Sequence, residues 1–188
     1  GCQVSMSKDA LKKGDVALIG ILSDENSSYK KGAARAPEYI RRALHSWSAN
    51  LCSELGVDLA NNPDFIYVGD REIADGADNF LAIETYIDQI IERGALPLIL
   101  GGDHAITYPI MRAINRAYGP INILHFDAHP DLYENFGGKP YSPSNPFART
   151  LENGLAKRLV QIGLRTHNNT PREQGRLFGV RCPENKRG

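Results

Sequence analysis

The sequence predicts an α/β protein in which helices cover both faces of a mostly parallel sheet, giving three layers (α/β/α). Short apolar segments alternate along the chain with segments of helical periodicity, which is the order of parallel strands and their crossover helices. One of these segments, residues 96–100, is apolar throughout, as expected for a strand covered on both faces. With 188 residues, 41% of them hydrophobic, the chain is long enough to bury a core.

Five apolar runs are predicted to form the strands of this sheet. Each run is short and is bounded by glycine, proline or polar residues, which favours a buried strand over a helix. The predicted strands are residues 16–22, 65–68, 96–100, 121–127 and 159–164.

The segments between these runs carry helix signals. Pro37 suits the first turn of a helix, and Gly94 is well placed to end the helix that contains Ile83 and Ile87. Helices are expected over residues 37–44, 80–91, 107–117, 147–157 and 171–177. No internal repeat or linker divides the chain, so we expect a single domain over residues 1–188, with residues 181–188 as an atypical polar tail.

The composition argues against several classes of partner. Lys plus Arg and Asp plus Glu are equal at 22 each, so no net charge attracts nucleic acid or an anionic membrane. No apolar run approaches the roughly 20 residues of a transmembrane helix. The three cysteines are widely spaced and read as free thiols. Together with the lack of a visible secretory signal, they lead us to expect a cytoplasmic protein.

Acidic and imidazole side chains gather at the end of the run 121–127. Asp127, His129 and Asp131 occupy every second position, so in an extended segment they share one face. Two carboxylates and an imidazole on one face repel and desolvate one another unless a cation lies between them. The alternative is a turn rich in helix-capping acids, which accounts for Asp131 but not for the whole set.

A second polar pair, Asp103 and His104, follows the run 96–100. Ligands of parallel sheets gather at the carboxyl ends of the strands, so His104 is expected near the first set if the two strands are neighbours. Two imidazoles and two carboxylates without a thiolate favour Mn²⁺ or a similar divalent ion, and zinc also fits. Gly101 and Gly102 are expected to permit a tight exit from the strand.

Two of these segments resemble signature motifs of the ureohydrolase family, which contains arginases, agmatinases, guanidinobutyrases and formiminoglutamases. The segments are GGDHAITYP at residues 101–109 and HFDAHPDL at residues 125–132. Shorter stretches within residues 141–149 and 172–180 are similar to the plant and bacterial arginase/agmatinase branch. The resemblance implies an arginase-like fold and a centre of two Mn²⁺ ions with a bridging hydroxide as the nucleophile.

The resemblance also implies the role of each metal ligand. His104 and Asp131 would hold one ion, His129 would hold the other, and Asp127 would bridge both. The remaining candidates are assigned to orienting a ligand or to a substrate loop: Asp103, His125, Ser142, Ser144 and Asn145. Asp103 could equally cap the following helix, and a hydrogen-bonded core histidine is the favoured interpretation of His125.

Two features depart from the family pattern. Pro143 occupies the position expected for a histidine that shuttles protons, so no catalytic residue is assigned. A later strand with Asp-x-Asp, which completes the metal site in the family, is absent from this sequence. We therefore expect a partial ureohydrolase domain without its C-terminal part, in which the metal ions bind weakly.

The resemblance implies an amidinohydrolase that cleaves a guanidino C–N bond and releases urea. Its substrate would be a small guanidino compound: arginine, agmatine, guanidinobutyrate or guanidine. A complete member would be a homo-oligomer, a trimer or hexamer. The alternative is a catalytically impaired member that binds metal weakly or acts as a non-catalytic subunit. A deacetylase-like protein with one zinc is disfavoured by the GGDH run at residues 101–104.

Overall fold

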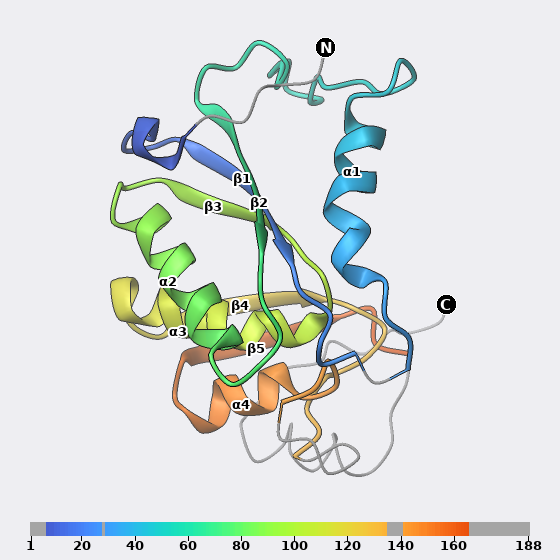
Figure 1. Cartoon of the computed structure of the whole chain (residues 1–188), viewed down its shortest axis with the longest axis vertical. Helices are drawn as coiled ribbons and strands as arrows, with labels where there is room; N and C mark the ends of the chain where they lie inside the picture. The colour runs from blue at the N-terminus through green and yellow to red at the C-terminus, as the bar shows by residue number, and fades with distance from the viewer. Residues whose placement is uncertain (1–6, 28, 135–140, 166–188) are drawn as a thin grey trace. The chain divides into compact units, whose positions relative to one another are not determined.

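The computed structural model describes residues 7–27, 29–134 and 141–165 (Figure 1). The chain divides into two compact units. Unit 1 contains residues 1–25 and 29–103, and unit 2 contains residues 26–28 and 104–188. The expected helix at residues 171–177 and the polar tail at 181–188 lie outside the described residues.

Unit 1 is built on a three-stranded parallel sheet in the order β2-β1-β3. Its strands are β1 (Val16–Leu22), β2 (Phe65–Glu72) and β3 (Leu96–Leu100). The helices are α1 (Ala36–Leu44) and α2 (Asn79–Ile91), with short 3₁₀ turns at Lys8–Ala10 and Ala33–Arg35. Figure 1 shows α1 and α2 on opposite sides of β1, which is the layering predicted for an α/β/α protein.

The central strand β1 carries the core of unit 1. Ala17, Ile19 and Ile21 are fully buried, and Ile83 and Ile87 of α2 are buried with them in this unit. Burial of each of these isoleucine side chains stabilises the fold by about 1.5–3 kcal/mol relative to exposure. The predicted periodicity of α2 is therefore confirmed. The helix ends at Ile91, and Gly94, with φ +75°, turns the chain toward β3.

The prediction for β3 was only partly right. Its bounds and its parallel pairing with β1 are as expected, but Leu96 and Leu98 are 56% and 45% exposed rather than covered. The reason is position, because β3 is an edge strand of the sheet that the described residues form. An apolar run indicates a strand, but coverage of both faces needs neighbouring elements.

Unit 2 contains a parallel pair of strands, β4 (Ile121–Phe126) and β5 (Ala156–Ile162). A 3₁₀ turn at His104–Ile106 leads into α3 (Thr107–Tyr118), and α4 (Pro146–Glu152) precedes β5. The helix predicted for residues 147–157 stops earlier because Asn153 and Gly154 end it, with Gly154 at φ +64°. Leu132, Phe147 and Leu159 form the apolar core of this unit.

The described strands thus confirm the α/β class. Three strands form the parallel sheet of unit 1, and β4 and β5 form the parallel pair of unit 2. The helices of the described residues are all too short or too polar to cross a membrane.

Candidate metal centre

The end of β4 places two candidate side chains, His125 and Asp127. His125 is the one buried residue of β4, whereas Asp127 follows the strand and is partly exposed. Their side-chain atoms Nε2 and Oδ2 lie 3.8 Å apart. His129 folds back on Asp127, because its backbone N–H donates to Asp127 Oδ1 at 2.8 Å and its Nδ1 lies 3.2 Å from the same oxygen. His125 and Asp127 therefore come together at the strand end, and a turn after the strand brings His129 to Asp127.

Asp131 is delivered by an unusual backbone conformation. Its φ is +50°, which makes it the one described non-glycine residue in the left-handed region. Aspartate tolerates this region better than most residues. Its carbonyl accepts a hydrogen bond from the Phe147 N–H at 3.3 Å, and its carboxylate is mostly buried. The turn thus carries a charged group into the interior of unit 2.

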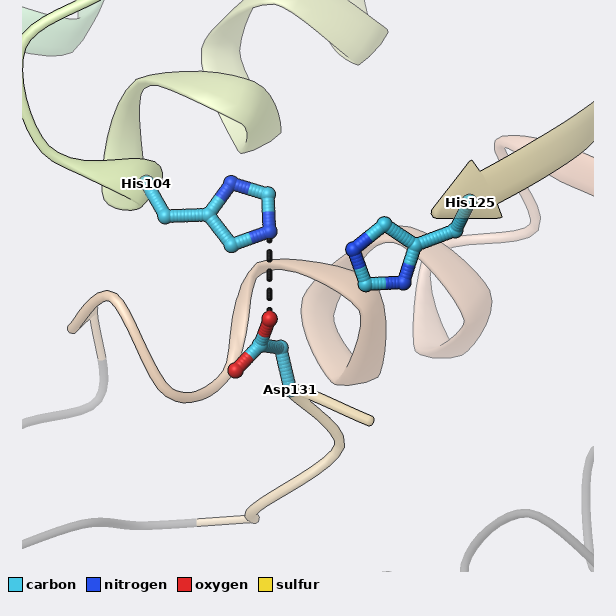
Figure 2. A group of neighbouring side chains, drawn as sticks. All are labelled: His104, His125 and Asp131. Atoms are coloured by element: carbon cyan, nitrogen blue, oxygen red, sulfur yellow. Dashed lines mark ion pairs between the residues drawn. The ribbon is translucent and has the colours of Figure 1, made fainter. Parts of the chain in front are cut away.

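His104 reaches the carboxylate of Asp131 from the 3₁₀ turn that precedes α3. His104 Nε2 lies 3.2 Å from Asp131 Oδ2, and Figure 2 shows the two side chains pointing at each other. The other ring nitrogen, Nδ1, lies 3.0 Å from the hydroxyl of Thr107, one turn along the chain. Nε2 is buried without a hydrogen-bond partner among the described atoms. A buried nitrogen left open beside a carboxylate is the arrangement that a cation would satisfy.

Three side chains meet the geometric requirement for holding a metal ion. His104, His125 and Asp131 each offer a ligand atom within 4.8 Å of the others (Figure 2). Of the ligands predicted from the sequence, His104 and Asp131 belong to this group. Asp127 and His129 pair with each other instead, and the carboxylate of Asp127 connects them to His125. The donor set of imidazoles and carboxylates therefore fits a divalent ion, and the assignment of individual ligands remains a prediction.

The electrostatics prepare these groups for a cation. Burial, reinforced by the nearby His104, lowers the pKa of His125, so this imidazole is neutral near neutral pH. Burial by itself raises the pKa of Asp127, but the hydrogen bond from the His129 amide and the neighbouring imidazoles outweigh it, and the net pKa is lowered. Asp127 is consequently ionised at neutral pH and presents a charged oxygen without first losing a proton.

The loop candidates form a tight turn inside unit 2. The Ser142 N–H donates to Asn145 Oδ1 at 2.7 Å, and the Ser144 N–H donates to Ser142 Oγ at 3.3 Å. Ser142 and Asn145 are almost completely buried. The Tyr133 N–H donates to the Ser144 carbonyl at 3.2 Å, which fastens this turn to the segment after Asp131. The described contacts of these residues thus position the loop, and residues 135–140 lie outside the described part.

The two other residues predicted to matter at a strand end, Gly102 and Asp103, follow β3 in unit 1. Asp103 is buried, and its N–H donates to the Ser23 carbonyl at 2.9 Å. A Cβ on Gly102 would come within 2.7 Å of the Ser23 carbonyl carbon. The expectation that a glycine is needed at this exit is therefore supported at Gly102.

Sequence reasoning missed two residues, Thr107 and Gln161. Thr107 lies three residues after His104, the spacing of one 3₁₀ turn, which could have suggested its contact. Gln161 interrupts the apolar run at residues 159–162 and is 1% exposed. A polar residue inside a buried strand needs partners, but the sequence does not say which ones.

Comparisons with known proteins agree with the fold. The model of the Arginase family matches residues 14–186. Arginase 2 (chloroplastic/mitochondrial) of Arabidopsis thaliana is 40% identical over 177 residues, which are 89% of this chain and 52% of that protein. Guanidinopropionase of Pseudomonas aeruginosa is 35% identical over 88% of this chain and 54% of its own length. The solved structure of arginase from Medicago truncatula matches with a TM-score of 0.83 and 39% identity, over 88% of this chain and 55% of that one.

The parallel α/β fold of the chain is the arginase fold. The chain belongs to the arginase family. It spans about half the length of the curated relatives that it matches.

Proposed function

We propose that this chain carries part of the active site of a manganese-dependent amidinohydrolase that cleaves a guanidino C–N bond and releases urea. The observation that carries the proposal is the open, buried Nε2 of His104 facing the carboxylate of Asp131, within a chain of the arginase family. His104 and Asp131 would hold one ion, His129 would hold a second, and Asp127 would contact both.

A pair of Mn²⁺ ions would supply Lewis acidity that makes a water molecule nucleophilic near neutral pH. The residues of the chain would then act in four ways. The imidazoles would offer ring nitrogens, and the carboxylates of Asp127 and Asp131 would offset the charge of the ions. The same carboxylates would favour a cationic guanidinium over a neutral urea. Thr107 would hold the ring of His104 so that Nε2 faces the site.

The substrate class, the assembly and the compartment are part of this proposal. A small guanidino compound is the expected substrate: arginine, agmatine, guanidinobutyrate or guanidine. A homo-oligomer, trimeric or hexameric, is the expected assembly of the complete protein. The cytoplasm is the proposed compartment, although the name of the Arabidopsis relative assigns that protein to the chloroplast or mitochondrion.

The test combines metal binding with urea release. Mn²⁺ binding to the purified chain is measured by calorimetry, and urea is assayed with each of the four guanidino compounds. We expect His104→Asn to weaken Mn²⁺ binding at least about 10-fold, because a ligand is lost. His45→Asn is the matched control, since His45 is an exposed histidine of unit 1. Equal binding by the wild type and His104→Asn would refute the assignment.

One observation favours a second function, metal binding without catalysis. Pro143 lies in the turn of residues 142–145 and cannot transfer a proton. This alternative predicts at most one weakly bound Mn²⁺ per chain and no urea from any of the four substrates. Urea formation, or two tightly bound ions per chain, would exclude it.

A further inference from the structure

Gln161 of β5 lies opposite His125 of β4 in the strand register. It is 1% exposed, and its amide nitrogen makes two contacts. Gln161 Nε2 lies 2.7 Å from the carbonyl oxygen of Pro130 and 3.1 Å from His125 Nδ1. One buried side chain therefore touches both the residue before Asp131 and the histidine beside Asp127.

The Pro130 carbonyl fixes the orientation of the Gln161 amide. A carbonyl oxygen only accepts hydrogen bonds, so the group 2.7 Å from it must be the NH₂ of Gln161. The flipped amide would set two acceptor oxygens against each other in a buried place, which is strongly unfavourable. The second hydrogen of the same NH₂ is then available to His125 Nδ1.

This orientation in turn fixes the tautomer of His125. Nδ1 accepts the hydrogen bond from Gln161 and therefore carries a lone pair and no proton. In a neutral imidazole the proton must then be on Nε2. Nε2 is the atom 3.8 Å from Asp127 Oδ2. A protonated ring nitrogen donates a hydrogen bond and has no lone pair for a metal ion.

We propose that Gln161 is a positioning residue of the metal centre, which holds His125 as the Nε2–H tautomer. His125 then presents its Nε2–H toward Asp127 Oδ2, 3.8 Å away, and is not a third ligand beside His104 and Asp131. The same amide fastens Pro130 and with it the turn that presents Asp131. The exclusion of His125 as a ligand rests on the proposed metal centre. The tautomer of His125 does not, because it is a property of the metal-free chain.

The ring contacts of His125 agree with this assignment. Its ring stacks on His104 with centroids 5.6 Å apart, and it packs on Phe147 with centroids 4.4 Å apart. These contacts and Gln161 hold the imidazole from three directions. A ring held in this way keeps its N–H directed into the cluster, which is the function of a group that orients a ligand.

The first experiment determines the tautomer in the metal-free protein. Two-bond ¹H–¹⁵N correlations of ¹⁵N-histidine-labelled protein show which nitrogen of each of the five histidines carries the proton. We expect His125 to be the Nε2–H tautomer, and the Nδ1–H tautomer would overturn the proposal. In Gln161→Glu, which offers only acceptors, we expect the proton of His125 to move to Nδ1. Gln89→Glu places the same charge change in unit 1 and should leave the His125 pattern unaltered.

The second experiment separates this inference from the proposed function. Loading with ¹¹³Cd²⁺, a spin-½ probe, produces a ¹¹³Cd–¹⁵N coupling at each histidine that ligates the ion. We expect a coupling at His104 and none at His125, and a coupling at His125 would overturn the proposal. Coupling at no histidine would refute the metal centre itself, and the tautomer of the metal-free protein would then decide the role of Gln161.

A third measurement does not depend on the folding of Gln161→Glu. Gln161→Met removes the amide with little change in volume, and we expect it to weaken Cd²⁺ binding about 10-fold or more. We also expect His125 in this variant to populate both tautomers, because nothing then selects Nδ1 as the acceptor. An unchanged Nε2–H tautomer together with unchanged Cd²⁺ affinity would show that Gln161 does not position the site.

Discussion

The two units treat their buried polar groups differently. In unit 1, the two terminal nitrogens of Arg41 (Nη1 and Nη2) donate to the two carboxylate oxygens of Asp70, each at 2.5 Å. The guanidinium also lies 4.7 Å from the centre of the Tyr67 ring. In unit 2, His104 Nε2 and the carboxylate of Asp131 face each other at 3.2 Å without a hydrogen bond. The Arg41–Asp70 pair of unit 1 is thus closed on itself, whereas the His104–Asp131 pair of unit 2 is left open.

This difference separates a structural role from a binding role. A β-bulge at Val68 shifts the register of β2, so that Tyr67 and Asp70 both meet Arg41 of α1. A pair with two charge-assisted hydrogen bonds between its two members stabilises the fold and needs no ligand. A network with a buried nitrogen left open is under-satisfied until a cation binds. The open network should therefore respond to metal ions, and the closed one should not.

The largest expected effect concerns the packing of unit 1. In Gly102→Ala the new Cβ would meet the backbone of Ser23, so the backbone must shift. We expect the free energy of unfolding to fall by about 3 kcal/mol or more. Gly20→Ala is the comparison, because its obstacles are the Asp70 side chain and Pro37 Cβ at 2.9 Å. Urea denaturation of both variants measures the loss, and a smaller effect for Gly102 than for Gly20 would contradict the close packing at Ser23.

Metal addition should distinguish the two units directly. At a Mn²⁺ concentration 100 times the dissociation constant, binding stabilises the bound state by about 2.7 kcal/mol. We expect hydrogen–deuterium exchange to slow in peptides from residues 121–132 of unit 2 and not in peptides from residues 65–72 of unit 1. Equal protection of both sets of peptides would remove the distinction between the open and the closed network.

A double-mutant cycle tests how the open network is held together. His125→Phe and Gln161→Met each leave a buried partner unsatisfied, and each should cost about 1–3 kcal/mol in the metal-free chain. The double variant should cost less than the sum, because two partners disappear together, with a coupling of about 0.5–3 kcal/mol. Thermal unfolding of the four proteins gives this coupling, and strict additivity would mean that the two side chains do not interact.

The smallest effect is expected at the closed network. Arg41→Lys keeps the charge but loses the paired hydrogen bonds and the ring contact, so we expect a loss of about 1–2 kcal/mol. Arg42→Lys is the control, since Arg42 and its partner Glu38 are 70% and 54% exposed and such a pair contributes little. A similar loss in both variants, measured by chemical denaturation, would show that the burial of the Arg41 pair has no special importance.

Much of the fold and part of the site could be predicted because they depend on local sequence. The bounds of β1 follow from an apolar run between polar residues, and Asp127 and His129 come together because they are neighbours on one turn. The sequence predicts that β2 ends at Val68, but the strand continues through Gly69 because a β-bulge at Val68 lets its pairing with β1 resume there. The partners of Gln161 could not be predicted, because they depend on the register of β4 with β5 and on where Pro130 turns.

The left-handed backbone at Asp131 also bears on how relatives of this chain should vary. The conformation costs a residue with a side chain of the order of 1 kcal/mol, and glycine adopts it freely. In a relative that does not bind the proposed ion, substitution of Asp131 by glycine would remove both this cost and a buried carboxylate. We therefore expect aspartate at this position in relatives that bind the ion and glycine to be tolerated in relatives that do not.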